Sequence, residues 1–150
     1  MNNKLEQVRN SINNIDERLN WNEYFITIAH LVSKRSSCNR LNVGCILVQD
    51  NRIISSGYNG HLAKTEHKSI IRNNHEQLTI HAEVNSIIDC AKRGITTNNA
   101  VAYITHFPCL NCFKTLIGAG ISKIYYSEDY KNDEIVYQLK EELNIEIIKL

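Results

Sequence analysis

Two short fragments constrain this chain most, because each places metal-binding atoms at the start of a predicted helix. The first is His81-Ala82-Glu83 and the second is Pro108-Cys109-Leu110-Asn111-Cys112. Cysteines three residues apart in the first turn of a helix lie on one face, so both sulfur atoms can bind one ion. The helix N-terminus also favours the thiolate over the thiol, through its dipole and its free N–H groups. The spacing therefore predicts a fold in which two helix starts meet around one metal ion.

The donor set favours a catalytic zinc site over a structural one. With His81 as the third ligand, three protein groups leave one tetrahedral position open, as catalytic zinc requires, and no fourth ligand is evident at this spacing. Glu83 is placed to move protons without binding the metal. A lone C-x-x-C would also fit a redox-active or an incidental pair. The two fragments together match the H-x-E…P-C-x-x-C pattern of zinc deaminases.

Length and charge exclude several classes of protein. A chain of 150 residues has the size of one domain. The formal net charge of +1 argues against a nucleic-acid partner, which would need a dense basic surface. No apolar run is long enough to span a bilayer, so no membrane partner is expected. The polar start, without an apolar signal segment, indicates a cytoplasmic protein with reduced cysteines.

The apolar pattern predicts an N-terminal helix over residues 1–20 and one domain over residues 21–150. Leu5, Val8 and Ile12 recur at helical spacing, and a second helix covers the region of Tyr24 to Val32. A hairpin is expected around Gln49-Asp50-Asn51. Residues 61–79 read as an irregular polar insertion. Helices over 80–91, 110–119 and 134–143 then alternate with strands over 100–105, 122–126 and 145–148, which predicts an α/β fold of five strands sandwiched by helices.

At these residues the chain resembles the cytidine and deoxycytidylate deaminase superfamily, from about Trp21 to the C-terminus. The fragments that carry the resemblance are Trp21-Asn22-Glu23-Tyr24-Phe25, Gly57-Tyr58-Asn59-Gly60, His81-Ala82-Glu83-Val84-Asn85 and Thr105-His106-Phe107-Pro108-Cys109-Leu110-Asn111-Cys112. The first two point within the superfamily to enzymes that use nucleotides. The resemblance implies a three-layer α/β/α cytidine-deaminase-like fold, with a central five-stranded mixed sheet flanked by helices. It also implies Zn2+ as the cofactor, with His81, Cys109 and Cys112 as ligands and Glu83 as the proton shuttle.

The resemblance further implies an activity. The expected reaction is the zinc-dependent hydrolysis of dCMP to dUMP and ammonia, which supplies dUMP for thymidylate synthesis. Family members are commonly hexamers regulated by dCTP and dTTP, so a homo-oligomer and these effectors are expected here. Two alternatives remain open: a deaminase of another cytosine compound, such as dCTP or cytidine, and a non-catalytic zinc-containing nucleotide sensor.

Substrate-binding residues follow in part from the same resemblance. Asn59 matches the asparagine that contacts the substrate sugar, the backbone around Ala82 frames the pyrimidine ring, and Tyr130 matches an aromatic residue near the nucleotide. A 5′-phosphate needs a local cation or free N–H groups. The candidates in the loop after the second helix, where relatives bind nucleotide, are Arg35, Ser36 and Arg40.

A second metal or regulatory site is a separate hypothesis. Some relatives carry a structural zinc ion in the insertion, built from cysteines and histidines. Cys38, His67 and His75 are the candidates in this sequence, although no fourth ligand is evident. Basic residues of the insertion are alternative contacts for a regulatory nucleotide.

Overall fold

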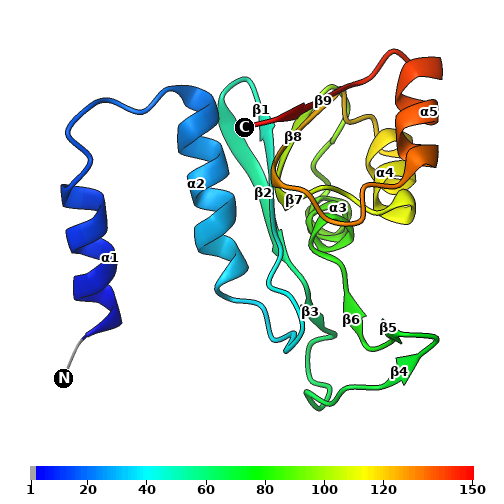
Figure 1. Cartoon of the computed structure of the whole chain (residues 1–150), viewed down its shortest axis with the longest axis horizontal. Helices are drawn as coiled ribbons and strands as arrows, with labels where there is room; N and C mark the ends of the chain where they lie inside the picture. Colours follow the sequence, from blue (N-terminus) through cyan, green and yellow to red (C-terminus); the bar gives the residue numbers. More distant parts are fainter. Residues whose placement is uncertain (1–2) are drawn as a thin grey trace.

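The computed structural model describes residues 3–150, and its helices and strands alternate in the second half of the chain (Figure 1). In chain order they are α1 (Lys4–Asn13), α2 (Trp21–Ser33), β1 (Gly44–Gln49), β2 (Arg52–Tyr58), β3 (Gly60–His61), β4 (Ile71–Arg72), β5 (His75–Glu76), β6 (Thr79–Ile80), α3 (Ala82–Arg93), β7 (Val101–His106), α4 (Leu110–Gly118), β8 (Lys123–Glu128), α5 (Glu134–Glu142) and β9 (Glu146–Lys149).

The centre of the molecule is a five-stranded mixed sheet. Its strand order is β2-β1-β7-β8-β9. The pairs β2–β1 and β1–β7 are antiparallel, whereas β7–β8 and β8–β9 are parallel and are connected through α4 and α5. Helix α2 covers one face, and α3, α4 and α5 cover the other (Figure 1). The predicted three-layer α/β/α fold is therefore confirmed.

Strand β1 contributes side chains to both hydrophobic cores, one on each face of the sheet. Successive side chains of a strand point to opposite faces of the sheet. Ile46 and Val48 pack with Phe25 of α2, while Cys45 and Leu47 belong to the larger cluster under α3 and α4. All four strand residues are at most 4% exposed. Because both faces are covered, β1 reads as an uninterrupted apolar run rather than an alternating one.

A glycine allows α3 to lie directly on the end of β2. A Cβ atom added at Gly57 would lie 2.3 Å from the carbonyl oxygen of Ala82 and 2.5 Å from Oγ of Ser86. Ser86 Oγ also donates to the carbonyls of Ala82 at 3.0 Å and Cys45 at 3.3 Å. This close contact fixes the start of α3, where the first metal-binding fragment lies, against the sheet.

The N-terminal region differs from the prediction in extent. The apolar spacing continues to Leu19, but α1 ends at Asn13 and buries none of its side chains. Helix α2 then begins at Trp21 because Asn20 and Glu23 form a capping box. The Asn20 side chain accepts from the Glu23 N–H at 2.9 Å, and the Glu23 carboxylate accepts from the Asn20 N–H at 2.8 Å. Helix α1 thus ends with its own C-cap at Asn14, and the Asn20 capping box starts the second helix.

The insertion contains more regular structure than expected. Strands β3 and β6 pair at its base, with Gly60 opposite Ile80, and β4 and β5 form a small hairpin at its far end. Strands of two residues in a polar segment give no apolar pattern from which the sequence could predict them. The pairing at the base places residue 60 beside residue 80, so both ends of the insertion lie next to the metal-binding fragment.

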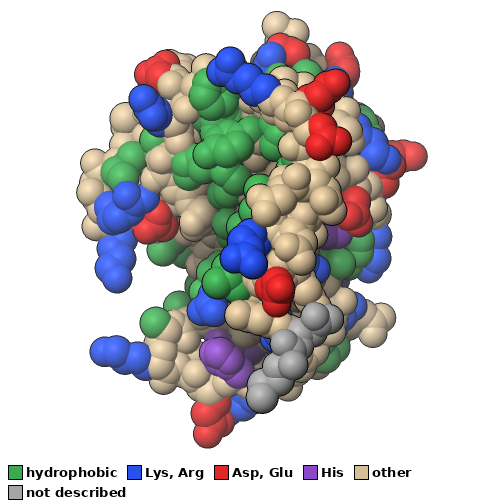
Figure 2. Space-filling view, turned by 90° about the vertical axis from the view of Figure 1, so that its left-hand side faces the viewer, with side chains coloured by type: hydrophobic (Ala, Val, Ile, Leu, Met, Phe, Trp, Pro, Cys, Tyr) green, Lys and Arg blue, Asp and Glu red, His purple; other side chains and the backbone are tan. Residues whose placement is uncertain are grey.

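Exposed apolar side chains gather on the face that carries α2. Figure 2 shows hydrophobic side chains in a hollow on this face, and Trp21, Tyr24 and Ile53 are each at least 40% exposed. They belong to the lining of a cavity of about 970 Å³ between the start of α2 and the β1–β2 turn. Among residues 3–150, no helix has the length and apolar character needed to cross a membrane.

Candidate metal centre and active site

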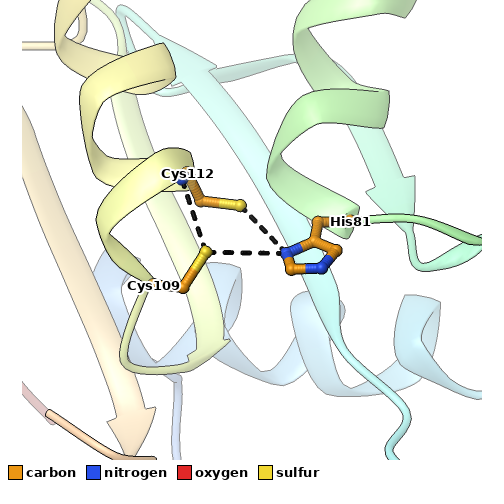
Figure 3. A group of neighbouring side chains, drawn as sticks. All are labelled: His81, Cys109 and Cys112. Carbon is orange, nitrogen blue, oxygen red and sulfur yellow. Dashed lines mark hydrogen bonds between the residues drawn. The ribbon is translucent and has the colours of Figure 1, made fainter. Parts of the chain in front are cut away.

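Two helix N-termini bring three ligand atoms together. His81 is the N-cap of α3, Cys109 is the N-cap of α4, and Cys112 lies in the first turn of α4. His81 Nδ1 lies 3.3 Å from Cys112 Sγ and 3.6 Å from Cys109 Sγ (Figure 3). All three ligand atoms lie within 4.8 Å of one another. The sequence prediction that the two fragments meet is therefore reproduced in three dimensions.

These distances fit a tetrahedral zinc site. Zinc–nitrogen and zinc–sulfur bonds are about 2.1 and 2.3 Å long, so a nitrogen–sulfur edge of the tetrahedron measures about 3.6 Å. The observed separations of 3.3 and 3.6 Å match this edge. His81 and Cys109 are exposed whereas Cys112 is buried, so the group opens toward solvent on one side. The donor set of one imidazole and two thiols leaves room there for a fourth, non-protein ligand.

Hydrogen bonds among the three ligand side chains favour the thiolate form of Cys109. Hydrogen bonding from Cys112, with further hydrogen bonds from His81 and the Cys112 N–H, lowers the pKa of Cys109 to about 4. The same contact with the Cys109 thiolate raises the pKa values of Cys112 and His81. The negative charge of one sulfur is thus stabilised by protons on its neighbours. A metal cation replaces such protons when it binds.

Glu83 lies beside this group but is buried. Its side chain is 4% exposed, and its carboxyl group is near enough to the Cys112 thiol to contribute to the raised pKa of that thiol. Burial raises the pKa of Glu83 above its usual range. A carboxyl group with a raised pKa exchanges its proton closer to neutral pH, which is what a general acid–base group requires. Its position in the first turn of α3, two residues after His81, keeps it next to the ligands.

Asn59 connects three parts of the candidate pocket. Its side-chain oxygen accepts from Ser36 Oγ at 2.7 Å and from the Val43 N–H at 2.8 Å. Its amide nitrogen donates to the Leu41 carbonyl at 2.6 Å. Asn59 is 7% exposed, so in this structure it fixes the loop between α2 and β1 as well as being the predicted sugar contact.

The three phosphate candidates do not share one environment. Ser36 bonds to Asn59, Arg40 Nη1 donates to the Asn74 carbonyl of the insertion at 2.9 Å, and Arg35 is exposed just after α2. Ser36 and Arg40 line a polar cavity of about 480 Å³ formed by residues 36–42, and Arg35 is not part of that lining. The structure thus brings Ser36 and Arg40 to one cavity and leaves Arg35 outside it.

Comparison with known proteins decides the family. The model of the cytidine and deoxycytidylate deaminase zinc-binding region matches residues 19–128, which include the metal-binding group and Glu83. This chain belongs to the cytidine and deoxycytidylate deaminase family. The matched segment begins just before α2 and ends with β8, so α1 lies outside the family region.

Relatives of this deaminase-family chain include ComE operon protein 2 and several deoxycytidylate deaminases. It is 42% identical over 135 residues to ComE operon protein 2 of Bacillus subtilis, covering 87% of this chain and 71% of the relative. It is 34% identical over 140 residues to deoxycytidylate deaminase of Saccharomyces cerevisiae, covering 87% of this chain and 45% of the yeast protein. The chain therefore spans less than half of the yeast relative.

A solved structure supports the same fold. The dCMP deaminase of the cyanophage S-TIM5, in complex with dCMP and dUMP, superimposes with a TM-score of 0.76 at 29% identity. The match covers 85% of this chain and 95% of the phage chain. The arrangement of sheet and helices described above is thus that of a nucleotide deaminase.

Tyr130 lies near the metal-binding loop of this deaminase fold, through His106. The two rings meet edge to face with centroids 6.1 Å apart, and Lys131 Nζ lies 5.6 Å from the centre of the Tyr130 ring. His106 lies three residues before Cys109, and its Nδ1 atom is 2.7 Å from Thr105 Oγ1. Tyr130 is 41% exposed, so it is available to a ligand at the edge of the site.

The candidates for a second metal site are not gathered into one. Within residues 3–150, the group of His81, Cys109 and Cys112 is the single set of three or more His, Cys, Asp or Glu side chains with ligand atoms close enough to share an ion. His67 instead stacks on His61 with ring centroids 4.8 Å apart. In this structure the ligand atoms of Cys38, His67 and His75 are therefore not close enough to one another to share an ion.

Two residues that hold the site in place received no role in the sequence analysis. Ser86 ties α3 to the sheet, as described above, and Asn85 bonds to the carbonyl of Tyr58. The available signal was their position: they lie two and three residues after Glu83, in a helix whose first turn carries the metal-binding fragment. A polar side chain on the sheet-facing side of such a helix needs a buried partner, and that partner is visible only in the fold.

Proposed function

We propose that this protein hydrolyses dCMP to dUMP and ammonia with a Zn2+ ion held by His81, Cys109 and Cys112. The observation that carries the proposal is the buried carboxyl group of Glu83 beside an open three-ligand group. The family membership and the deoxycytidylate deaminase relatives support dCMP as the substrate. The product dUMP would supply thymidylate synthesis.

The chain's own residues account for the proton transfers. When bound, the zinc ion supplies the Lewis acidity by which a water becomes a nucleophile at neutral pH. The Glu83 carboxylate accepts the proton that this water loses. The protonated Glu83 then donates a proton to the amino group that leaves the pyrimidine ring. Both transfers need one carboxyl group with a pKa closer to neutrality, and the burial of Glu83 supports that role.

The proposed nucleotide contacts surround this centre. Asn59 contacts the sugar, the backbone around Ala82 frames the ring, and Tyr130 lies against the nucleotide. For the 5′-phosphate, Ser36 and Arg40 share the polar cavity after α2, and the exposed Arg35 supplies a second cation. An arginine can bind a phosphate through two parallel hydrogen bonds. This supports a nucleotide over a free nucleoside as the substrate.

The proposed substrate is tested by ammonia release from dCMP, CMP, dCTP and deoxycytidine, with the zinc content determined on the same sample. We expect one zinc ion per chain and the highest kcat/KM for dCMP. A preference for dCTP would leave the proposed zinc-dependent deamination unchanged but would require a different assignment of the residues that bind the phosphates. A zinc-loaded protein that binds these nucleotides and releases no ammonia from any of them would instead be a sensor.

We also propose that the protein works as a hexamer regulated by dCTP and dTTP. The exposed apolar side chains at the start of α2 and at the β1–β2 turn support association, since monomeric proteins rarely expose a large apolar patch. The cytosol is the proposed compartment, because two thiolate ligands require reduced cysteines. Light scattering gives the mass of the assembly. Rate curves against dCMP that dCTP and dTTP leave unchanged would contradict the regulation.

For the division into residues 1–20 and 21–150, we propose that the first segment is not needed for the fold. Deleting residues 1–16 removes α1, which buries no side chain, and keeps the Asn20 cap of α2. We expect the thermal midpoint of the truncated protein to stay within about 2 °C of the full chain, because surface changes alter stability by about 0.5 kcal/mol or less. A larger decrease, measured by circular dichroism, would show that α1 stabilises the folded protein.

A further inference from the structure

The two chain segments that flank the metal group are held together by a side chain that is neither a ligand nor a proton carrier. The insertion leaves the domain after β3 and returns through β6, where Gly60 lies opposite Ile80. The residue just before this base on one side is Asn59, and the residue just after it on the other side is His81. The position of Asn59, the proposed sugar contact, relative to the metal ligand His81 therefore depends on the pairing of β3 with β6.

Asn85 of α3 reaches both segments. Its Nδ2 atom donates to the Tyr58 carbonyl at 2.8 Å and lies 3.5 Å from the Ile80 carbonyl. Its backbone N–H donates to the His81 carbonyl at 2.9 Å. Tyr58 directly precedes Asn59, and Ile80 directly precedes His81. The Asn85 amide thus connects the backbone just before Asn59 to the backbone just before His81.

We infer that Asn85 is a positioning residue that sets the distance between the Asn59 loop and the metal centre, an inference that rests on the proposed function. The amide is suited to this role because its two N–H groups can serve two carbonyl oxygens at once. An aspartate of the same shape has no donor when ionised and places negative charge against these carbonyls. The two hydrogen bonds of this side chain go to the backbone before Asn59 and before His81, and not to a metal ligand atom or a predicted substrate contact, so it acts on the substrate through Asn59.

The test compares Asn85→Ala and Asn85→Asp with wild type and with Asn10→Asp, the same isosteric change on exposed α1. The readouts are zinc per chain, thermal midpoint, KM and kcat for dCMP, and the affinity for dUMP by calorimetry. We expect zinc content to be retained, KM to rise about 10-fold or more and kcat to change less, because a lost substrate contact weakens binding. Asn10→Asp leaves all values unchanged. Variants that lose only thermal stability while KM stays constant would overturn the inference.

If Asn85→Ala is unstable, Asn85→Ser replaces it as the milder variant. A double-mutant cycle that combines the Asn85 substitution with Asn59→Ser then tests whether the two residues act together. If Asn85 acts through Asn59, the second substitution raises KM no further in the Asn59→Ser background. Independent, additive effects would overturn the inference. Wild-type turnover of dCMP with unchanged KM in the Asn85 variants refutes this inference alone. Absence of both dCMP turnover and dUMP binding in the wild type refutes the proposed function and this inference with it.

Discussion

Replacing Glu83 with glutamine is expected to lower kcat for dCMP by about 10²–10⁴-fold, the range that a positioned general acid–base group contributes. Glutamine keeps the size of the side chain and a hydrogen-bonding partner for Cys112, but it neither accepts nor delivers the proton. Because Glu83 is not among the three ligand atoms, zinc content should remain at one ion per chain. Steady-state kinetics and metal analysis on the same sample measure both effects.

The matched control for this change is Glu142→Gln, which removes a carboxylate from the exposed end of α5. Its kcat should equal that of the wild type. If Glu83→Gln retained full turnover, another group would have to carry the protons. If wild type and Glu83→Gln bound dUMP equally and neither released ammonia, the zinc-containing sensor would be the correct reading.

The second large effect is expected for Cys112→Ser. The buried thiol of Cys112 lies 3.3 Å from His81 Nδ1, and a serine hydroxyl is not a thiolate donor for zinc. Changes in residues that only support zinc ligands already weaken binding by about 10–100-fold. Loss of a ligand should exceed this, so the purified variant should carry little zinc and show no measurable turnover.

Cys90→Ala provides the comparison for this variant. Cys90 is also a buried cysteine, 1% exposed, but it lies in the core cluster under α3, away from the three-ligand group. It should retain one zinc ion per chain. If Cys112→Ser kept its zinc under dialysis against a chelator as firmly as Cys90→Ala, the assignment of Cys112 as a ligand would be wrong.

Much of the site was predictable because its chemistry is local in the sequence. Cys109 and Cys112 are separated by two residues, so helix geometry alone places their sulfur atoms on one face, and the single residue between His81 and Glu83 keeps both at the start of α3. The five strands were also predictable, since each is a short apolar run bounded by polar turns. Such signals depend on the spacing of residues along the chain and need no knowledge of distant contacts.

The N-terminal region shows where such signals fail. Leu5, Val8, Ile12 and Leu19 follow helical spacing, yet the helix ends at Asn13 and its apolar side chains remain exposed. Helical spacing reports that a segment can form an amphipathic helix, and packing of the apolar face provides most of the stability of such a helix. The capping pair of Asn20 and Glu23 was an available local signal for the boundary.

The sequence by itself determined the α/β fold with its five-stranded sheet and the metal-binding group, because these follow from short-range spacing and residue chemistry. The tertiary structure decided how the substrate side of the site is held. It showed Asn59 bonded to Ser36 and Val43, and Asn85 bonded to Tyr58, across 16 to 27 positions of the chain. Buried polar groups must find hydrogen-bond partners, and only the folded chain shows which of many distant groups supply them.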